Sequence, residues 1–424
     1  MTSIGHTRWA TACAAACVVF LCLSGRVDAS VVNDAQGLCG AMKTVQSAVR
    51  PQASEPSFMP SYRTVREDVD SLPAALRETA FVYDNALAAM AFIACGDTQA
   101  ARAIGDAFVA ASAEDRHYRD GRLRNAYRAG PVAKPPLLPG FWDDDAGRWM
   151  EDEYQASTAV GNVAWAALAL LQLHRQTGDP SYLDTALRLG RWLEQFVDPS
   201  GSGLTGGYYG FEPKPARISW KSTEHNIDVV AVGRWLWSET QDPRWTALSE
   251  SALSFLTVMQ DSRAGFFIGT DGKGSAASNA GTVLDAQVWP LMVLPKQDRP
   301  AAWEGSIARI DELLGVPGGY DFNGDRDGMW VEGTSQMALL FALESENERA
   351  DALIASVMEN RDAKSGWLFA TRENQISTGL TIDAAGQGEE FRYYRWPHLG
   401  ATAWAVLAIT RFNPFRPNEP SEIR

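Results

Sequence analysis

The sequence predicts an all-α protein, a closed (α/α)6 toroid of six helical hairpins, and three observations support this. Apolar segments rich in small residues alternate with amphipathic segments along most of the chain. A short Gly-Asp or Asp-Pro break separates the two members of most pairs, and such residues end one helix and begin the next. A long loop rich in Gly and aromatic residues precedes most of the apolar segments. An inner ring requires helices that are buried on all sides, and an outer ring requires helices with one face in water. The alternation of the two kinds along the chain therefore predicts two rings.

The clearest hairpin spans residues 157–197. Residues 159–176 carry Ala, Trp and Leu on nearly every side, so this helix is predicted to be buried. Gly178 ends the helix and Pro180 begins the next one, residues 182–196, which is charged on one side only. The pair therefore predicts one inner and one outer helix.

Four further hairpins follow the same pattern. They pair residues 85–94 with 98–111, 228–240 with 244–259, 286–294 with 301–314, and 334–343 with 346–358. A last apolar helix, residues 400–410, has no partner after it, and residues 33–49 are expected to supply one by closing the ring. An open solenoid of helical repeats is the rival architecture, but the long irregular loops favour a closed toroid.

The first 29 residues have the features of a signal peptide. Arg8 precedes an apolar run over residues 10–23, and Val27 to Ala29 form a small-x-small cleavage motif. The run is short for a membrane-spanning helix, although an uncleaved anchor and a lipoprotein are the alternatives. We therefore expect residues 30–424 to form one catalytic (α/α)6-barrel domain that is exported to the periplasm or out of the cell.

The formal net charge of the chain is −14. An acidic surface repels phosphate groups, which argues against nucleic acids and anionic membranes as partners. No later segment is long and uncharged enough to span a bilayer. Cys39 and Cys95 remain once the leader is removed, and they could pair in an oxidising compartment or simply be small buried residues. Two Cys without clustered His make no zinc site.

Several predicted inner helices begin with a carboxylate close to an aromatic residue. These acidic residues are Asp84, Glu224, Asp285 and Glu332. Because the loops before the inner helices gather at one rim, the four side chains are expected to converge on a common mouth. Helix capping is the alternative role, and it is the favoured one for Asp84 and Asp285 taken singly. For Glu224 and Glu332, capping and catalysis are equally weighted.

Sugars bind where aromatic faces lie beside polar groups, and the predicted mouth offers both. The residues expected to contact a sugar are Asp84, Trp142, Tyr154, Trp220, His225, Asn226, Asp228, Trp289, Trp330, His398 and Trp404. Core packing is the alternative for each tryptophan, and about half of the 15 in the chain should only pack. A structural role is likewise the default for an isolated histidine, but His225 and His398 enter helices at the same predicted rim.

One polar segment resembles a calcium loop. Its candidate ligands are Asp321, Asn323, Asp325 and Asp327. Counted from Asn323, the loop lacks its closing acid because Thr334 stands there, and counting from Asp321 misplaces the Gly. We therefore expect no cofactor in this segment, and an Asx-rich turn is the simpler interpretation of its polar residues. Bound Ca²⁺ is the weaker alternative.

The whole pattern resembles the six-hairpin (α/α)6-barrel superfamily of carbohydrate-active proteins, which holds glycoside hydrolases, some polysaccharide lyases and sugar 2-epimerases. The resemblance covers most of residues 33–412. It rests on the hairpin rhythm and on the motifs Lys-Ser-Thr-Glu-His-Asn-Ile-Asp (221–228) and Trp-Val-Glu-Gly-Thr (330–334), rather than on one diagnostic signature. In similar enzymes the catalytic groups come from the inner-helix entries, and the matching positions here are Glu224, Asp285 and Glu332.

The resemblance and the carboxylates together favour an exported glycoside hydrolase that cleaves a poly- or oligosaccharide. Glu224 is expected to be the general acid, and Asp285 or Glu332 the base. Inversion of configuration is expected, because carboxylates from separate hairpins face each other across a gap wide enough for water.

Two other functions stay open. A lyase or epimerase on the same fold would move a proton with His225 and His398, and a lyase would need Arg392 and Arg395 to neutralise a uronate. A non-catalytic glycan-binding or envelope-assembly protein would keep the aromatic residues without needing the carboxylates.

Overall fold

The computed structural model describes residues 29–50, 52, 55–63, 72–261, 263, 265–271, 281–381 and 390–418. Residues 1–28 of the predicted signal peptide lie outside this part of the chain, so its cleavage and the domain boundary at residue 30 stay predictions. No helix in the described part is long and apolar enough to cross a membrane.

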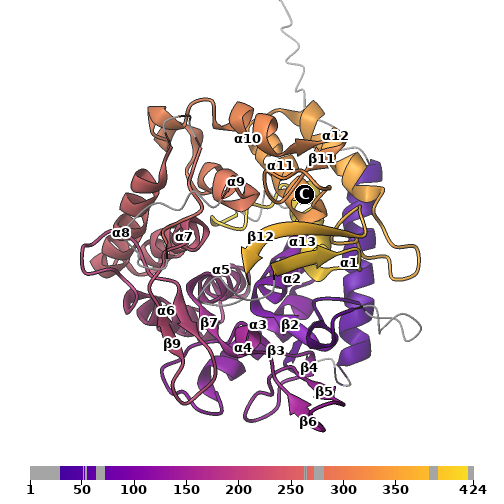
Figure 1. Cartoon of the computed structure of the whole chain (residues 1–424), viewed down its shortest axis with the longest axis vertical. Helices are drawn as coiled ribbons and strands as arrows, with labels where there is room; N and C mark the ends of the chain where they lie inside the picture. The colour runs from indigo at the N-terminus through magenta and orange to yellow at the C-terminus, as the bar shows by residue number, and fades with distance from the viewer. Residues whose placement is uncertain are drawn as a thin grey trace, which may run out of the picture.

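Two concentric rings of helices build the molecule (Figure 1). The inner ring consists of α2 (Val82–Ala94), α5 (Val160–Thr177), α7 (Thr223–Thr240), α9 (Leu284–Val293), α11 (Val331–Leu343) and α13 (Leu399–Thr410). The outer ring consists of α1 (Ala29–Val49), α3 (Thr98–Ala113), α6 (Pro180–Glu194), α8 (Pro243–Met259), α10 (Ser306–Leu314) and α12 (Asn347–Met358). Each inner helix packs against the next, α13 packs against α2, and α1 packs against α13. The predicted toroid of six hairpins is confirmed, including its closure by the first helix.

The inner helices are buried because their sequences are apolar on every side. In α13 every residue from Leu399 to Ile409 is buried, whereas in α12 only Ala350 and Val357 are. A helix of the first kind must have protein on all sides, and one of the second kind keeps a wet face. This contrast in the sequence therefore assigns each helix to its ring.

Short turns connect α2, α5, α7 and α11 to the outer helices that follow them, at one end of the barrel, whereas twelve residues join α9 to α10. Gly178 ends α5 with a φ of 68°, and the Asp179 carboxylate accepts a hydrogen bond from the Ser181 amide to cap α6. Gln241 likewise ends α7 with a φ of 56°, and the Asp242 carboxylate accepts a hydrogen bond from the Arg244 amide to cap α8. The sequence signals for helix ends were therefore correct at these turns.

The two helix boundaries that differ most from the prediction are the starts of α7 and α10. Helix α7 begins at Thr223 rather than at residue 228, because the Ser222 hydroxyl accepts a hydrogen bond from the His225 amide and caps the helix earlier. Helix α10 begins at Ser306 rather than at residue 301. The preceding Gly305 has a φ of 89°, which breaks the helix from the turn at Ala301–Trp303.

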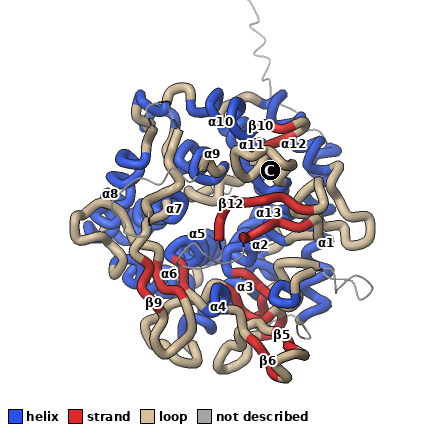
Figure 2. Tube along the Cα trace, viewed as in Figure 1, coloured by secondary structure: helices blue, strands red, loops and turns tan. Residues whose placement is uncertain are grey.

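Short antiparallel strands, which the sequence did not predict, shape many of the loops (Figure 2). The pairs are β1 (Ser57–Phe58) with β4 (Gly130–Pro131), β2 (Thr79–Phe81) with β3 (Ala126–Arg128), β5 (Phe141–Asp143) with β6 (Arg148–Met150), β10 (Gly315–Val316) with β11 (Gly319–Tyr320), and β12 (Gln375–Thr381) with β13 (Glu390–Tyr394). A three-stranded sheet joins β7 (Thr158–Ala159), β8 (Gly207–Tyr209) and β9 (Ala216–Ile218). The remaining short elements are α4 (Glu153–Ala156), η2 (Ala74–Leu76), η3 (Lys296–Asp298) and η4 (Ala301–Trp303).

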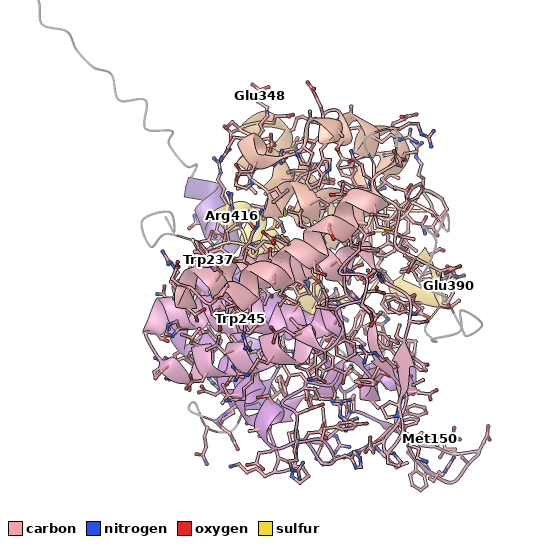
Figure 3. The ribbon with its side chains drawn as sticks, turned by 90° about the vertical axis from the view of Figure 1, so that its left-hand side faces the viewer. Met150, Trp237, Trp245, Glu348, Glu390 and Arg416 are labelled. Atoms are coloured by element: carbon pink, nitrogen blue, oxygen red, sulfur yellow. A yellow bond between two sulfur atoms is a disulfide. The ribbon has the colours of Figure 1, made fainter. Side chains whose placement is uncertain are left out.

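The segment after α13 covers the end of the barrel where the inner helices finish. The Phe415 ring lies 5.1 Å from the Trp165 ring and 5.6 Å from the Trp289 ring, measured between centroids. The Asn413 side-chain amide donates to the Met292 carbonyl at 3.0 Å. Figure 3 shows Arg416 on one side of the molecule and Glu390 of β13 on the other.

A disulfide joins Cys39 in α1 to Cys95, the residue that follows α2. It links the first outer helix to the first inner helix, across 56 positions in the sequence. Of the two roles that the sequence left open for these cysteines, the structure therefore has the paired one.

Candidate active site

Three inner helices bring a histidine between two carboxylates at the barrel mouth. The His398 Nε2 atom lies 3.4 Å from Asp84 Oδ2, and its Nδ1 atom lies 3.7 Å from Glu332 Oε2. Gly400 makes this approach feasible, because a Cβ atom there would lie 2.7 Å from the Glu332 carboxylate and 2.8 Å from that of Asp84. Residues from α2, α11 and the start of α13 thus form one polar cluster.

Tyr83 holds the Glu332 side chain in place. The tyrosine hydroxyl donates a hydrogen bond to Glu332 Oε1 at 2.6 Å. The same hydroxyl accepts one from the Trp404 indole at 2.8 Å. This chain of bonds fixes one oxygen of Glu332 and leaves its Oε2 without a hydrogen bond within the described protein.

The protonation of His398 is set by opposing groups. Burial lowers its pKa, but the neighbouring Asp84 and Glu332 carboxylates outweigh this effect and raise the pKa above its usual value. The Ala401 amide donates to Nδ1 at 3.3 Å, which requires that nitrogen to lack a proton. In this geometry Nε2 faces Asp84 and Nδ1 accepts from Ala401, so protonation of Nδ1 would break the Ala401 bond.

A second group of carboxylates comes from α7 and α9. Glu224 lies in the first turn of α7, and Asp228 lies one turn further along the same helix. Burial, and then the charge of Glu224, raise the pKa of Asp228 and that of Asp285 well above their usual values. Asp285 also responds to the charge of Glu332, so the two groups form one continuous acidic site.

Both glutamates have pKa values suited to proton transfer near neutral pH. Burial raises the pKa of Glu224 to about 7. Burial also raises the pKa of Glu332 to about 7, with His398 opposing the shift and Asp84 adding to it. Glu332 is only 1% exposed, whereas Glu224 keeps partial access to solvent. Glu224 therefore lies at the opening of the site, and Glu332 lies deeper.

Buried polar atoms without a hydrogen bond are concentrated in this region. Among the described residues they include Asp84 Oδ2, both oxygens of Asp228, Asp285 Oδ1, Glu332 Oε2, His225 Nδ1, Gln336 Nε2 and Trp165 Nε1. Buried polar groups normally have partners in the protein or in ordered water. The site thus concentrates buried polar groups, and some of them face each other: Trp165 lies beside Asp228, and Gln336 lies beside Asp285.

Three of the predicted sugar contacts lie next to Glu224 and keep partial exposure. The Trp220 ring is 5.9 Å from that of His225, and the Tyr154 hydroxyl responds to the charge of Glu224. His225 fits against α5 because Gly161 has no side chain; a Cβ atom there would lie 2.4 Å from the imidazole. Burial lowers the pKa of His225 to about 4, so it is neutral at pH 7.

Five of the predicted sugar contacts are contradicted by their burial, and one of them is Asp228, which is 0% exposed. Trp289, Trp330 and Trp404 are at most 1% exposed, so none presents a face on which a sugar could stack. The Asn226 side chain is fully buried and bonds the backbone of Leu204. Trp404 still matters to the site, because it positions Tyr83.

Trp142 is separate from the carboxylate cluster. It lies on the β5–β6 hairpin and is 58% exposed. Its predicted contact with a sugar is therefore not part of the mouth itself.

Three tyrosines complete the mouth, and the sequence analysis did not select them. The Tyr62 ring lies 4.7 Å from the His398 ring, and the Tyr393 ring lies 6.0 Å from it. Burial and the nearby carboxylates raise the pKa of Tyr62, Tyr83 and Tyr393 well above the usual value. Adjacency to Asp84 was the available signal for Tyr83. Tyr62 comes from a segment without periodicity, and Tyr393 from an unpredicted strand.

The candidate calcium ligands mostly bond the backbone around them. Asp321, Asp325 and Asp327 each place a carboxylate oxygen within 4.8 Å of the others. However, the two oxygens of Asp321 accept from the amides of Phe322 and Gly328, and the Asn323 side chain accepts from the Asp325 amide. These contacts are those of the Asx-rich turn, the simpler of the two interpretations of this segment.

Comparison with known proteins supports the fold and leaves the activity open. No family model and no curated protein match the chain. A glycosidase solved in complex with glucose matches with a TM-score of 0.57 and 12% identity, over 91% of this chain and 98% of that one. The cellobiose 2-epimerase from Spirochaeta thermophila matches with a TM-score of 0.59 and 13% identity, over 91% and 98%.

A family 76 glycoside hydrolase from a bovine Bacteroides thetaiotaomicron strain matches with a TM-score of 0.55 and 12% identity, over 90% of this chain and 78% of that one. At these identities the likeness establishes a common architecture alone. The chain has the six-hairpin glycosidase-like fold, and no specific family within it is indicated.

Proposed function

We propose that the protein is an exported glycoside hydrolase that cleaves a poly- or oligosaccharide at the mouth of the barrel. The observation that carries the proposal is the pairing of Glu224 and Glu332, two glutamates at one mouth whose pKa values are both raised to about 7. Glycoside hydrolysis needs one carboxylic acid that is protonated and one carboxylate that is ionised, flanking the same bond. The charge of Glu224 adds to the raised pKa of Glu332, so the two groups do not titrate independently.

The positions of the two residues suggest their roles. Protonated Glu224, at the opening, gives its proton to the leaving oxygen as the glycosidic C–O bond breaks. Ionised Glu332, held by Tyr83, takes a proton from the water that attacks the anomeric carbon. The two proton transfers balance, and attack from the opposite face gives inversion. Asp285, close to both glutamates, is the alternative base.

Epimerisation is the second candidate, and the His398 cluster favours it. A histidine between two carboxylates can remove a proton from a sugar carbon and pass it on, and His225 is neutral and available as a partner. One of the structural neighbours is a sugar epimerase.

A uronate lyase has less support, because Arg392 pairs with Glu390 and the Arg395 guanidinium lies 4.2 Å from the Phe369 ring centroid. Neither arginine is arranged to neutralise a uronate at the mouth. A non-catalytic glycan-binding protein remains the alternative if no turnover is found.

Product analysis separates these functions. Residues 30–424 would be incubated with neutral and acidic glycans, and the products assayed for new reducing ends, for the absorbance of a new double bond, and for epimers by NMR. We expect new reducing ends alone, lost in Glu224→Gln and kept in Glu348→Gln, which alters an exposed glutamate of α12 (Figure 3). Epimers or unsaturated products would overturn hydrolysis, and the absence of any product would favour the binding function.

Export is the second part of the proposal. The leader sequence supports it, and so does the Cys39–Cys95 disulfide, since disulfides persist in oxidising compartments. Mass spectrometry of the protein from its native cells should find an N-terminus at residue 30. A chain that retains residue 1 and stays in the cytoplasm would contradict export.

A further inference from the structure

The β5–β6 hairpin exposes an unusual amount of aromatic surface. Among the described residues, six large apolar side chains are exposed, and three of them lie between residues 137 and 149. They are Leu137 at 49%, Trp142 at 58% and Trp149 at 44%. Exposed tryptophans that share a surface usually mark a binding site, because leaving them in water is unfavourable.

The two tryptophans share one face of the hairpin. Trp142 and Trp149 are directly opposite in the antiparallel register, and opposed residues point to the same side of a strand pair. The surroundings fix Trp149. The Arg128 guanidinium lies 5.0 Å from its ring centroid, and a Cβ atom at Gly140 would lie 2.3 Å from its indole nitrogen.

The turn between the strands is also ordered by its own bonds. The Asp143 carboxylate accepts from the Ala146 amide at 2.8 Å, and Gly147 takes a φ of 62° that closes the turn. The hairpin is therefore a preformed platform rather than a loose loop.

The hairpin lies on the same side of the barrel as the candidate active site. Figure 3 shows Met150 of β6 on the side that carries Glu390 of β13 and opposite Arg416. Arg116 forms ion pairs with Glu151, which follows β6, and with Glu212, in the turn between β8 and β9. A fixed ion-pair bridge thus connects the hairpin to the loop that leads to Trp220 and Glu224.

Phe211 is a further exposed aromatic residue, in the loop at the other end of this ion-pair bridge. It is 40% exposed, and it precedes Glu212 in the β8–β9 turn. The hairpin turn carries Asp143, Asp144 and Asp145 against Arg148, on a chain of net charge −14. This charge disfavours anionic lipids and acidic polymers and suits a neutral chain of sugars.

We propose that Trp142 and Trp149 form a platform that binds a neutral polysaccharide whose reacting part lies at Glu224. The apolar faces of the sugar rings stack on the two indoles, and the chain continues past Phe211 to the mouth. This inference rests on the proposed function, because that function places the reacting end of the polysaccharide at Glu224. It specifies a polymer rather than a disaccharide as the preferred substrate.

The test compares a double variant, Trp142→Ala with Trp149→Ala, with the control Trp237→Ala. Trp237 is also 44% exposed but lies near the opposite end of the barrel, on the side of Arg416 (Figure 3). Affinity electrophoresis in gels containing a neutral α-glucan, β-glucan or α-mannan measures binding without turnover. We expect the double variant to bind at least one of these polymers about tenfold more weakly than the wild type, and Trp237→Ala to be unchanged.

Kinetics separate this inference from the proposed function. On the polymer, the double variant should raise KM about tenfold, while its kcat and its kinetics on a trisaccharide stay within about twofold of the wild type. Unchanged polymer binding and KM, with normal trisaccharide hydrolysis, would overturn the platform alone. Platform-dependent binding without any hydrolysis would overturn only the proposed function.

Other occupants of the platform give different results. If the double variant loses self-association in analytical ultracentrifugation, or loses binding to phosphatidylcholine vesicles, but keeps polymer binding, the proposal is wrong. Circular dichroism and thermal melting of each variant establish that the loss does not come from unfolding.

Discussion

The two ends of the barrel are built on opposite principles. At the end where the inner helices finish, turns of a few residues carry well-satisfied caps such as Asp179 and Asp242, and Phe415 packs against the central aromatic rings. At the end where the inner helices begin, long loops carry short strands, and several oxygens of buried carboxylates lack a hydrogen bond among the described residues. The first end is arranged for stability, and the second carries the candidate site.

The difference has an energetic meaning. Raising the pKa of a buried carboxyl from 4.5 to about 7, as at Glu332, corresponds to about 3 kcal/mol of unfavourable interaction when the group is ionised. Packing and capping elsewhere must offset such costs for the fold to persist. The closed end and the Cys39–Cys95 disulfide provide part of that stability.

The largest expected effect is at the end that carries the candidate site. Glu332→Gln should lower kcat on a glycan substrate about 10³-fold, or about 4 kcal/mol, because the base is lost. The same change should leave the melting temperature at pH 8 equal or higher, since it removes a buried charge. Steady-state kinetics and thermal melting check the two effects together. Wild-type turnover with a lowered melting temperature would show that Glu332 is structural.

The next effect is at the closed end. Phe415→Ala should lower the free energy of unfolding by about 3 kcal/mol, because it opens a cavity beside Trp165 and Trp289. Urea denaturation measures this loss. Turnover below the melting transition should fall by no more than about tenfold, because Trp165 also packs against Tyr83, the residue that bonds Glu332. A large loss of activity without loss of stability would break the division between the two ends.

The pH dependence of stability tests the buried carboxyls of the mouth. Between pH 4.5 and about 7 the unfolded chain releases the proton of Glu332, while the folded protein retains it. Stability therefore falls as pH rises through this window, and the contribution of this group is at most about 3 kcal/mol. The free energy of unfolding is measured as a function of pH for the wild type and for Glu332→Gln. The difference between the two slopes gives the contribution of Glu332. Identical slopes would mean that Glu332 titrates normally.

The smallest effect concerns a single cap at the closed end. Asp242→Ala should cost about 1 kcal/mol of stability, since the carboxylate accepts the Arg244 amide at 3.0 Å. Its kcat should equal that of the wild type. A change in kcat here would show that the closed end influences the chemistry.

The architecture was predictable because local signals specify it. Apolar periodicity identified the inner helices, and Gly178, Asp179 and Pro180 marked a turn that the structure confirms. The unpartnered helix of residues 400–410 even predicted that the first helix would close the ring.

The candidate site was only partly predictable, because burial at the mouth depends on the packing of distant segments. The same pattern of an aromatic residue near a carboxylate describes Trp220, which is partly exposed, and Trp330, which is fully buried. Tyr62 and Tyr393 reach His398 through loops whose paths no periodicity specifies. Strand pairing in these loops is likewise a tertiary effect.

The most direct test of the account is the ratio of turnover to binding in Glu224→Gln, on the glycan that the wild type hydrolyses. If Glu224 is the general acid at a shared mouth, kcat should fall by about 10²- to 10⁴-fold while the Kd for the glycan stays within about threefold. Wild-type turnover in Glu224→Gln would contradict the account.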